Sequence, residues 1–432
     1  MQTIGSSHSG GVTPSESTLR ANSATTVVVG MSGGVDSSVT AALLKEQGYR
    51  VIGMFMKNWD EKDENGVCTS VQDFQDVARV CDRLDIPYTS VEFVKEYWDN
   101  VFSHFLREYA AGHTPNPDIL CNREIKFNVF FRKAIEEMGA DFLATGHYCQ
   151  SVLVPGTGPS DISRHRLVKG ADAGKDQTYF LYTMREEVLR KVLFPVGALQ
   201  KKEVREIAHK YDLATKEKKD STGICFIGER DFREFLSKYI AGKPGDFRHL
   251  DGTVAGRHYG AAYYTLGQRR GLGLGGEGES WYVVGKDISK NIVYVERGGE
   301  HPALYADELW ATELSLVDAS TRALGAGFAI PAEGLRLRAK VRYRQPDQDC
   351  VAKPVLDAQG NPTGGIHVAF DQPQRSITPR QSVVFYQGDV CLGGAMIDRA
   401  GASYYEQGRT IGHSIGLTVP SAEVPELSAL ST

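Results

Sequence analysis

The residues of this chain best suited to chemistry begin with the segment Ser32 to Ser38, which reads Ser-Gly-Gly-Val-Asp-Ser-Ser. It lies between a β-branched apolar run, Thr25–Val29, and a stretch whose apolar residues recur at helical spacing. Glycines let the backbone approach a polyanion closely, and the free N–H groups of a helix N-terminus bind phosphate. The alternative is a glycine turn that merely begins a helix. Because no Gly-Lys-Ser/Thr ending follows, the segment differs from the loops of enzymes that transfer a γ-phosphate.

A cysteine follows a second segment, His113 to Asp118, which combines two prolines with polar residues. The prolines fix an extended entry, and Asp118 is a candidate N-cap for a helix that begins here. A thiol in the first turn of that helix, near Arg123 and Lys126, would have a lowered pKa and be partly thiolate at neutral pH. By themselves, these residues favour the simpler alternative, in which Cys121 is a small buried side chain beside a helix cap.

A second candidate thiol, Cys225, lies between Ile224 and Phe226, and these apolar neighbours also suit a core position. The chain has seven cysteines and no Cys-x-x-Cys pair, so we expect neither a disulfide scaffold nor a zinc site. No metal site is expected from the histidines either, because none shows metal-ligand spacing. We expect a reducing compartment, with the remaining cysteines packed as small hydrophobic side chains. These are Cys68, Cys81, Cys149, Cys350 and Cys391.

Length and composition indicate a globular protein of two or three domains, with 432 residues, 41% of them hydrophobic, and a formal net charge of −5. No apolar run approaches the roughly 18 residues of a membrane span, so no membrane segment is expected. The polar tails, 1–24 and 403–432, are predicted to lack fixed structure. The first tail holds a single arginine, too little charge for an organelle transit peptide, and we expect a cytoplasmic protein.

The order of elements predicts an α/β fold followed by β structure. Strand-like runs alternate with helical patterns over residues 25–230, which predicts a doubly wound, mostly parallel sheet. A small central domain is expected over 231–302. Short strands separated by turns over 303–402 predict a C-terminal β-barrel.

One predicted barrel strand, Leu335–Arg344, alternates apolar and basic residues. Period-two alternation would place five cations on one face, where they would bind RNA phosphates or form a solvated outer surface. The acidic total charge permits such a local basic patch, since binding depends on the patch and not on the sum.

Taken in order, several motifs carry a family resemblance. The segment at 32–38 resembles the PP-loop of ATP pyrophosphatases. It is joined by FMKNWDE, GHTPNPDILCNREIKF, ATGHY, GKDQTYFLY, KDSTGICFIGERDFREFL, YTLGQRRGLG and RYRQP. Together these are similar to the bacterial tRNA-specific 2-thiouridylases, from about Val27 to about Ile397. NPDILCN and STGICFIG are the motifs specific to that family.

The resemblance implies a role for three groups of residues. Cys225 would receive sulfur as a persulfide, Cys121 would resolve it by forming a disulfide with Cys225, and Asp118 would act as an acid/base group. ATP, accompanied by Mg²⁺, would be bound by Gly30, Met31, Ser32, Gly33, Gly34, Val35, Asp36, Ser37, Met56 and Gly146. The tRNA would be contacted by Asn116, Pro117, Asp118, His147, Lys175, Asp176, Gln177, Arg342, Tyr343 and Gln381.

The implied reaction activates C2 of the wobble uridine as an adenylate and then replaces its oxygen with sulfur. The implied partners are tRNA and a sulfur donor, which is either a cysteine desulfurase or a persulfide carrier. The enzyme itself is expected to be a monomer. Another PP-loop adenylating ligase is the first alternative, but amidating chemistry has no use for two cysteines. The second is a non-catalytic nucleotide or RNA-binding protein.

The chain departs from the family pattern at Pro379-Arg380-Gln381, where the family has a turn glycine at the middle position. An arginine there predicts a changed local backbone, which weakens the assignment of Gln381 to RNA.

Overall fold

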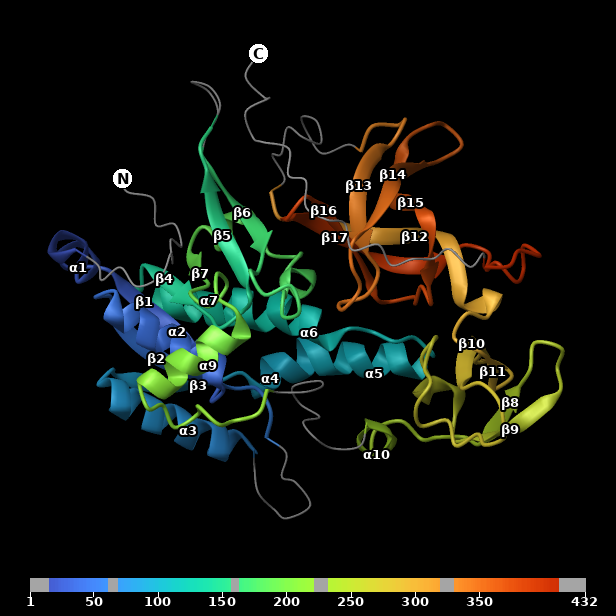
Figure 1. Ribbon diagram of the computed structural model, residues 1–432, viewed down its shortest axis with the longest axis horizontal. Helices are drawn as coiled ribbons and strands as arrows, with labels where there is room; N and C mark the ends of the chain where they lie inside the picture. The colour runs from blue at the N-terminus through green and yellow to red at the C-terminus, as the bar shows by residue number, and fades with distance from the viewer. Residues whose placement is uncertain (1–14, 61–68, 157–162, 221–231, 319–329, 412–432) are drawn as a thin grey trace.

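The computed structural model describes residues 15–60, 69–156, 163–220, 232–318 and 330–411. Its first part contains a parallel five-stranded sheet in the order β3-β2-β1-β4-β7 (Figure 1). The strands are β1 (Thr26–Met31), β2 (Arg50–Lys57), β3 (Tyr88–Glu92), β4 (Phe142–Ala144) and β7 (Val192–Leu193). This confirms the predicted doubly wound sheet. The strand order reverses between β1 and β4, where sheets of this kind bind ligands at the carboxyl ends of their strands.

Helices cover both faces of this sheet, because alternate residues of the buried strands point to opposite sides. Val27 and Val29 pack on one side with α2 (Val35–Glu46), α3 (Thr69–Leu84) and α9 (Lys201–Lys210). Val28 packs on the other side with η2 (Cys121–Val129), α7 (Phe130–Arg132) and η3 (Lys133–Glu137). Shorter helices, η4 (Thr178–Phe180) and α8 (Glu186–Leu189), follow β4 in the chain.

A rod of three consecutive helices joins the parallel sheet to the central region. It consists of α4 (Val94–Tyr97), η1 (Trp98–Phe102) and α5 (Ser103–Ala110), and it runs towards the central sheet in Figure 1. That sheet has the order β10-β11-β8-β9. Phe105 on α5 shares one hydrophobic core with Phe247 and Val293 of the central sheet. The central elements are α10 (Phe232–Ser237), β8 (Gly245–Arg248), β9 (Val254–His258), η5 (Ala261–Tyr263), β10 (Trp281–Asp287), β11 (Ile292–Arg297) and η6 (Pro302–Leu304).

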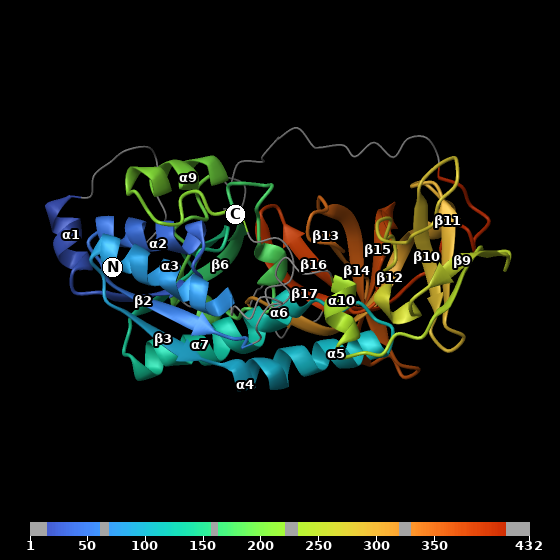
Figure 2. The ribbon, with the colours of Figure 1, turned by 90° about the horizontal axis from the view of Figure 1, so that it is seen from below.

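The predicted C-terminal barrel is present. Its strands are β12 (Tyr305–Leu316), β13 (Leu335–Lys340), β14 (Gln348–Leu356), β15 (Pro362–Arg375), β16 (Ser382–Gln387) and β17 (Val390–Ala400). Pairing of β12 with β17 closes the ring. A hairpin from the first part of the chain, β5 (Cys149–Val154) and β6 (Arg164–Lys169), extends the barrel sheet beyond β17. The barrel and the central sheet lie beside each other in Figure 2.

Two predictions about local structure are wrong. The basic strand ends at Lys340, not at Arg344, because the chain turns there and Arg342 is drawn inward to hydrogen-bond backbone carbonyls. The predicted tails are also too long. Residues 16–22 form α1 (Glu16–Asn22), capped by Ser15 and tied to the end of α2 by a hydrogen bond from Asn22 Nδ2 to the carbonyl of Gln47.

Residues 403–411 of the second predicted tail also make contacts with the barrel. Arg409 pairs with Asp307 of β12 at 2.7 Å and donates to the hydroxyl of Tyr404. Across the described residues, no helix has the length and apolarity that crossing a membrane requires.

Candidate active site

The glycine-rich segment forms the turn between β1 and α2, as the sequence predicts. Gly33 has a φ of +75°, which glycine adopts at no steric cost. Gly34 is the N-cap of α2, and no side chain caps the helix there. The first N–H groups of a 12-residue helix are therefore left for a ligand, with the positive end of the helix dipole behind them.

Serine hydroxyls hold the shape of this turn. Ser37 Oγ accepts from the backbone N–H of Ser32 at 3.2 Å and donates to the carbonyl of Gly34 at 3.1 Å. Ser32 Oγ accepts from the N–H of Gly34 at 3.3 Å. These hydrogen bonds fix the conformation of the loop before a ligand binds. Less conformational entropy is therefore lost on binding.

Two predicted nucleotide-binding residues outside the loop lie at the same edge of the sheet. Met56 is near the carboxyl end of β2, next to Phe55, whose register partner on β1 is Met31. Gly146 follows β4, and a Cβ there would lie 2.8 Å from backbone atoms of Asp36 and Ser37. Only a residue without a side chain fits this close to the start of α2, so glycine at 146 is a packing requirement.

A network of charged groups surrounds Asp36, the first acidic residue of α2. Its Oδ1 accepts from the hydroxyl of Tyr148 at 2.7 Å and pairs with Lys201 Nζ at 2.7 Å. Lys201 Nζ also lies 2.9 Å from Asp220, which Lys175 and Arg205 approach at 2.7 and 2.8 Å. One ammonium group therefore joins the phosphate-binding turn to the residue that precedes the Cys225 segment.

No role was predicted for Tyr148, Lys201 or Asp220, although the first and last of these lie in two of the family motifs. Their partners are up to 165 positions away along the chain. Burial alone would raise the pKa of Asp220, but hydrogen bonds from Lys175 and Lys201 outweigh it and lower that pKa to about 2. Asp220 is therefore ionised at neutral pH. Lys201 is the first residue of α9, which follows β7. A lysine at that position was the local feature from which a contact with the nucleotide site could have been predicted.

The second predicted site is built differently from the expectation. The N-cap of α6 (Pro117–Leu120) is Asn116, not Asp118, and Asn116 Oδ1 accepts from the N–H groups of Asp118 and Ile119. Pro117 takes the first helical position, where its missing N–H costs nothing. Cys121 consequently lies beyond the first turn, at the start of the π-helical stretch η2.

Asp118 and Cys121 occupy protected positions. Burial raises the pKa of Asp118, and the charge of Lys126 opposes that shift. Cys121 is 2% exposed and packs in the core shared with the central sheet. Cys225 lies outside the described residues, as does Cys68.

The other cysteines pack as small hydrophobic side chains, as predicted. Cys81, Cys149, Cys350 and Cys391 are buried, and burial raises the pKa of each thiol. None of these four is suited to nucleophilic chemistry at neutral pH.

The residues assigned to tRNA form two groups. In the first, Tyr343 donates to the carbonyl of Lys175 at 3.4 Å, and Gln177 accepts from the N–H of Tyr148 at 2.9 Å. Asp176 is 5% exposed, and its carboxylate accepts from Thr178 and pairs with Lys340. Its position is that of a buried structural carboxylate, because these partners already use its oxygens.

His147 lies beside the first group. Its Nδ1 is 2.8 Å from Thr145 Oγ1, and its ring contacts those of Phe127 and Phe194. Burial lowers the pKa of His147 well below its ordinary value, with a smaller contribution from the charge of Lys126. A neutral imidazole can offer a hydrogen bond to a base but no charge to a phosphate.

The second group gathers around Asn116. Gln381 Nε2, on the turn before β16, donates to the carbonyl of Thr114 at 2.5 Å. The barrel thus reaches the segment that carries Asn116, Pro117 and Asp118.

Three cations of the basic strand have acidic partners. Arg336 binds Asp371, Arg338 binds Asp347, and Lys340 binds Asp176. Arg342 is held inside by the carbonyls of Leu266 and Ser376. The expected row of five cations on one strand face is therefore wrong. The strand ends at Lys340, and partners from distant positions already engage Arg336, Arg338, Lys340 and Arg342.

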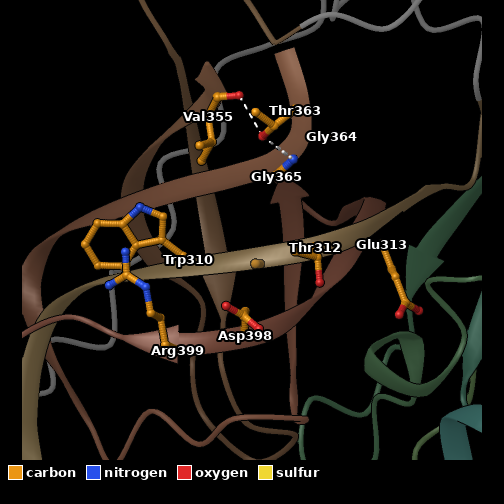
Figure 3. Close-up of a pocket in the computed structure, with 10 residues that line it drawn as sticks. Trp310, Thr312, Glu313, Val355, Thr363, Gly364, Gly365, Asp398 and Arg399 are labelled. Carbon is orange, nitrogen blue, oxygen red and sulfur yellow. Dashed lines mark hydrogen bonds between the residues drawn. The ribbon is translucent and has the colours of Figure 1, made fainter. Parts of the chain in front are cut away.

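A hollow on the barrel lies between β12, β14, β15 and β17 (Figure 3). The Arg399 guanidinium lies 3.5 Å from the centre of the Trp310 ring, and Glu313 and Asp398 also line the hollow. No predicted site residue is among its lining residues.

Comparison with known proteins assigns all three parts of the chain. Residues 25–229 match the tRNA methyl transferase HUP domain, residues 233–297 match the tRNA methyl transferase PRC-barrel domain, and residues 307–397 match the aminomethyltransferase β-barrel domain. Relatives that align with nearly the whole chain are named for a different chemistry, the thiolation of uridine in tRNA.

Three such relatives are each a tRNA-specific 2-thiouridylase MnmA. That of Protochlamydia amoebophila is 58% identical over 388 residues, which is 90% of this chain and 97% of the relative. That of Halalkalibacterium halodurans is 55% identical over 374 residues, 87% of this chain and 95% of the relative. That of Exiguobacterium sibiricum is 54% identical over 376 residues, 87% and 94% respectively.

Proposed function

The chain belongs to the tRNA-specific 2-thiouridylase family, and we propose that it forms 2-thiouridine at the wobble position of tRNA by adenylation followed by sulfur transfer from a persulfide on Cys225. The observation that carries the adenylation step is the uncapped N-terminus of α2 between β1 and β4. It offers phosphate-binding N–H groups without the lysine that γ-phosphate transfer uses.

The first step activates the uridine. Its O2 attacks the α-phosphorus of ATP, pyrophosphate leaves, and C2 then carries AMP as its leaving group. Asp118 removes the N3 proton, which makes O2 more nucleophilic. The N–H groups of the Gly33–Asp36 turn stabilise the phosphate charge.

Mg²⁺ bound with ATP would neutralise the charge that develops on the leaving pyrophosphate. The described residues contain no cluster of three metal-ligating side chains, so the ion would be held mainly by phosphate oxygens. Asp36 is the residue that would hold it from the protein side, since carboxylate oxygens suit a hard cation.

The second step transfers sulfur. The terminal sulfur of the Cys225 persulfide attacks C2, AMP leaves, and the base is joined to Cys225 through an S–S bond. Cys121 thiolate then attacks Sγ of Cys225, which forms a Cys121–Cys225 disulfide and releases the thiouridine. A cellular thiol reduces that disulfide before the next cycle.

We place domain boundaries at 25–230, 231–302 and 303–402. A cysteine desulfurase or a persulfide carrier would load Cys225, and the enzyme would act as a cytoplasmic monomer. Lys175, Gln177 and Tyr343 would contact tRNA on one side of the uridine, and Asn116 and Gln381 on the other.

Nucleoside analysis tests the proposed function directly. Unmodified tRNA is incubated with the protein, Mg-ATP, and cysteine with a cysteine desulfurase, and the digested tRNA is examined by mass spectrometry. We expect one 2-thiouridine for each AMP and pyrophosphate, and none without ATP. If ATP is split to AMP and pyrophosphate but no donor yields thiouridine, the nucleotide site stands and the substrate assignment does not.

Replacing Asp118 with asparagine is expected to lower the thiolation rate by about 100-fold, the lower range for a lost general base. In the wild type, the rate should rise with pH through the raised pKa of Asp118, whereas the variant should lack this rise. A measured pH profile of single-turnover thiolation checks both expectations.

Replacing Asp118 with asparagine is expected to raise the free energy of unfolding at neutral pH, although it lowers the thiolation rate. Because the folded pKa of Asp118 lies above its unfolded value, the folded state binds more protons in that window. The free energy of unfolding therefore falls as pH rises through the window, and asparagine removes that loss. A variant that is both inactive and less stable at neutral pH would contradict the assignment.

A further inference from the structure

Arg380 has an unusual backbone conformation for a residue with a side chain. Its φ is +67°, in the left-handed region that glycine normally occupies. The backbone N–H of Arg380 donates to the carbonyl of Ile397 at 2.8 Å, which fixes the turn before β16. The sequence predicted that arginine would change this turn, whereas the arginine adopts the conformation that a turn glycine would have. The contacts of its side chain are what a glycine at this position could not make.

The side chain of Arg380 reaches the helical rod. Its Nε lies 3.2 Å from Oε2 of Glu108 on α5, and both side chains are largely buried. The same Oε2 lies 2.7 Å from Nδ1 of His113, and His104 is 3.9 Å from the other oxygen. Glu108 thus links the barrel turn to His113, which lies in the segment Gly112–Asn116.

The barrel and the central region also hold that segment. Gln381 of the barrel donates to the carbonyl of Thr114. From the central region, Lys286 Nζ donates to the carbonyl of Gly112 at 2.6 Å, and Thr265 Oγ1 lies 3.1 Å from Thr114 Oγ1. Two positions beyond Thr114, Asn116 caps the helix that presents Asp118.

We propose that Arg380 is a positioning residue for thiolation: its ion pair with Glu108 sets the orientation of the Gly112–Asn116 segment and, through the Asn116 cap, that of the Asp118 carboxylate. The inference rests on the proposed function, because it assigns Asp118 to the reacting uridine. The neighbouring residues Arg380 and Gln381 both contact this part of the chain, Arg380 through Glu108 and Gln381 through the carbonyl of Thr114. The barrel turn therefore fixes the position of the Gly112–Asn116 segment.

A simple RNA contact is the competing account, since an arginine on a tRNA-binding enzyme also binds phosphate. The two accounts differ at Glu108. If Arg380 acts through Glu108, neutralising Glu108 has the same effect as losing Arg380. If Arg380 binds phosphate, neutralising Glu108 frees its charge and strengthens tRNA binding.

The test compares Arg380→Gly, Glu108→Gln and the double variant in the thiolation assay, with kcat and the KM for tRNA measured separately. Glycine keeps the left-handed turn, so the single variant removes the ion pair without straining the backbone. We expect kcat to fall roughly 10-fold in each variant, and the double variant to match the single ones, because misplaced catalytic groups cost rate more than binding. KM should stay within about twofold.

Other outcomes overturn the inference. A raised KM in Arg380→Gly with a lowered KM in Glu108→Gln would identify a phosphate contact, and unchanged kcat in both variants would remove any positioning role. Unfolding midpoints of all variants show whether a lost rate reflects lost folding. Absence of thiouridine with the wild type would instead count against the proposed function itself.

Discussion

Serine in place of Cys225 should abolish 2-thiouridine formation, and serine in place of Cys121 should stop the reaction at a covalent tRNA–protein adduct. A hydroxyl cannot carry a persulfide, so the first variant has no sulfur to transfer. In the Cys121 variant, the terminal sulfur of the Cys225 persulfide can still attack C2. No thiolate is then available to break the S–S bond that joins the base to Cys225. Without added reductant, the adduct should be visible on a denaturing gel and disappear when a thiol is added. We expect product below about 0.1% of the wild type in both cases, because removing a nucleophile typically costs more than three orders of magnitude.

Cys350→Ser provides a matched control for these variants. Cys350 is fully buried in the barrel core, and Cys121 is nearly so. Each substitution therefore buries a hydroxyl at a cost of roughly 1–3 kcal/mol. Equal loss of activity in the control would mean that stability, not sulfur chemistry, explains the result. An adduct formed by Cys225→Ser would show that another thiol delivers the sulfur.

Replacing Gly33 with alanine should nearly eliminate ATP turnover. An added Cβ would lie 2.7 Å from the carbonyl oxygen of Asp73 and 2.9 Å from its Cα, and both are backbone atoms that cannot simply rotate away. Left-handed φ adds a further ~1–2 kcal/mol for any residue with a Cβ. Together we expect roughly 3–4 kcal/mol, a fall of about 100- to 1000-fold in kcat/KM for ATP. Pyrophosphate release in the presence of tRNA measures this directly.

Gly139→Ala separates the effect of the left-handed backbone from the effect of the close approach to Asp73. Gly139 also has a positive φ, of 68°, but no atom lies within 4 Å of the position of an added Cβ. This variant should lose about 1 kcal/mol of stability and keep its ATP turnover. If both alanine variants behave alike, backbone strain alone accounts for the effect, and the close approach to Asp73 is unimportant.

Local patterns in the sequence were enough to predict the framework of the site. The run Thr25–Val29, the turn at Gly33 and the helix after it are neighbours in the chain, and each carries its own signal. The parallel sheet and the barrel were predicted from the same kind of pattern. The strand ends were less accurate, because Arg342 turns inward to carbonyls that no local pattern reveals.

Pairings between distant residues could not be predicted. Asp36 and Lys201 are 165 positions apart, and the charges of Arg336 and Lys340 are neutralised by Asp371 and Asp176. A basic strand with hidden acidic partners has the same sequence pattern as one that binds RNA. The helix cap is a subtler case, since Asn116 and Asp118 are both good caps and the proline between them decides which one is used.

The hairpin formed by β5 and β6 joins the barrel to the part of the chain that contains the parallel sheet. Leu167 and Val168 pair with Cys391 and Val390 of β17, so one continuous sheet contains strands from the first half of the chain and from the barrel. A fragment that stops before the barrel would leave an unpaired strand edge, which favours aggregation. A chain shortened at this junction would therefore expose the edge of β6 that β17 covers in the whole protein.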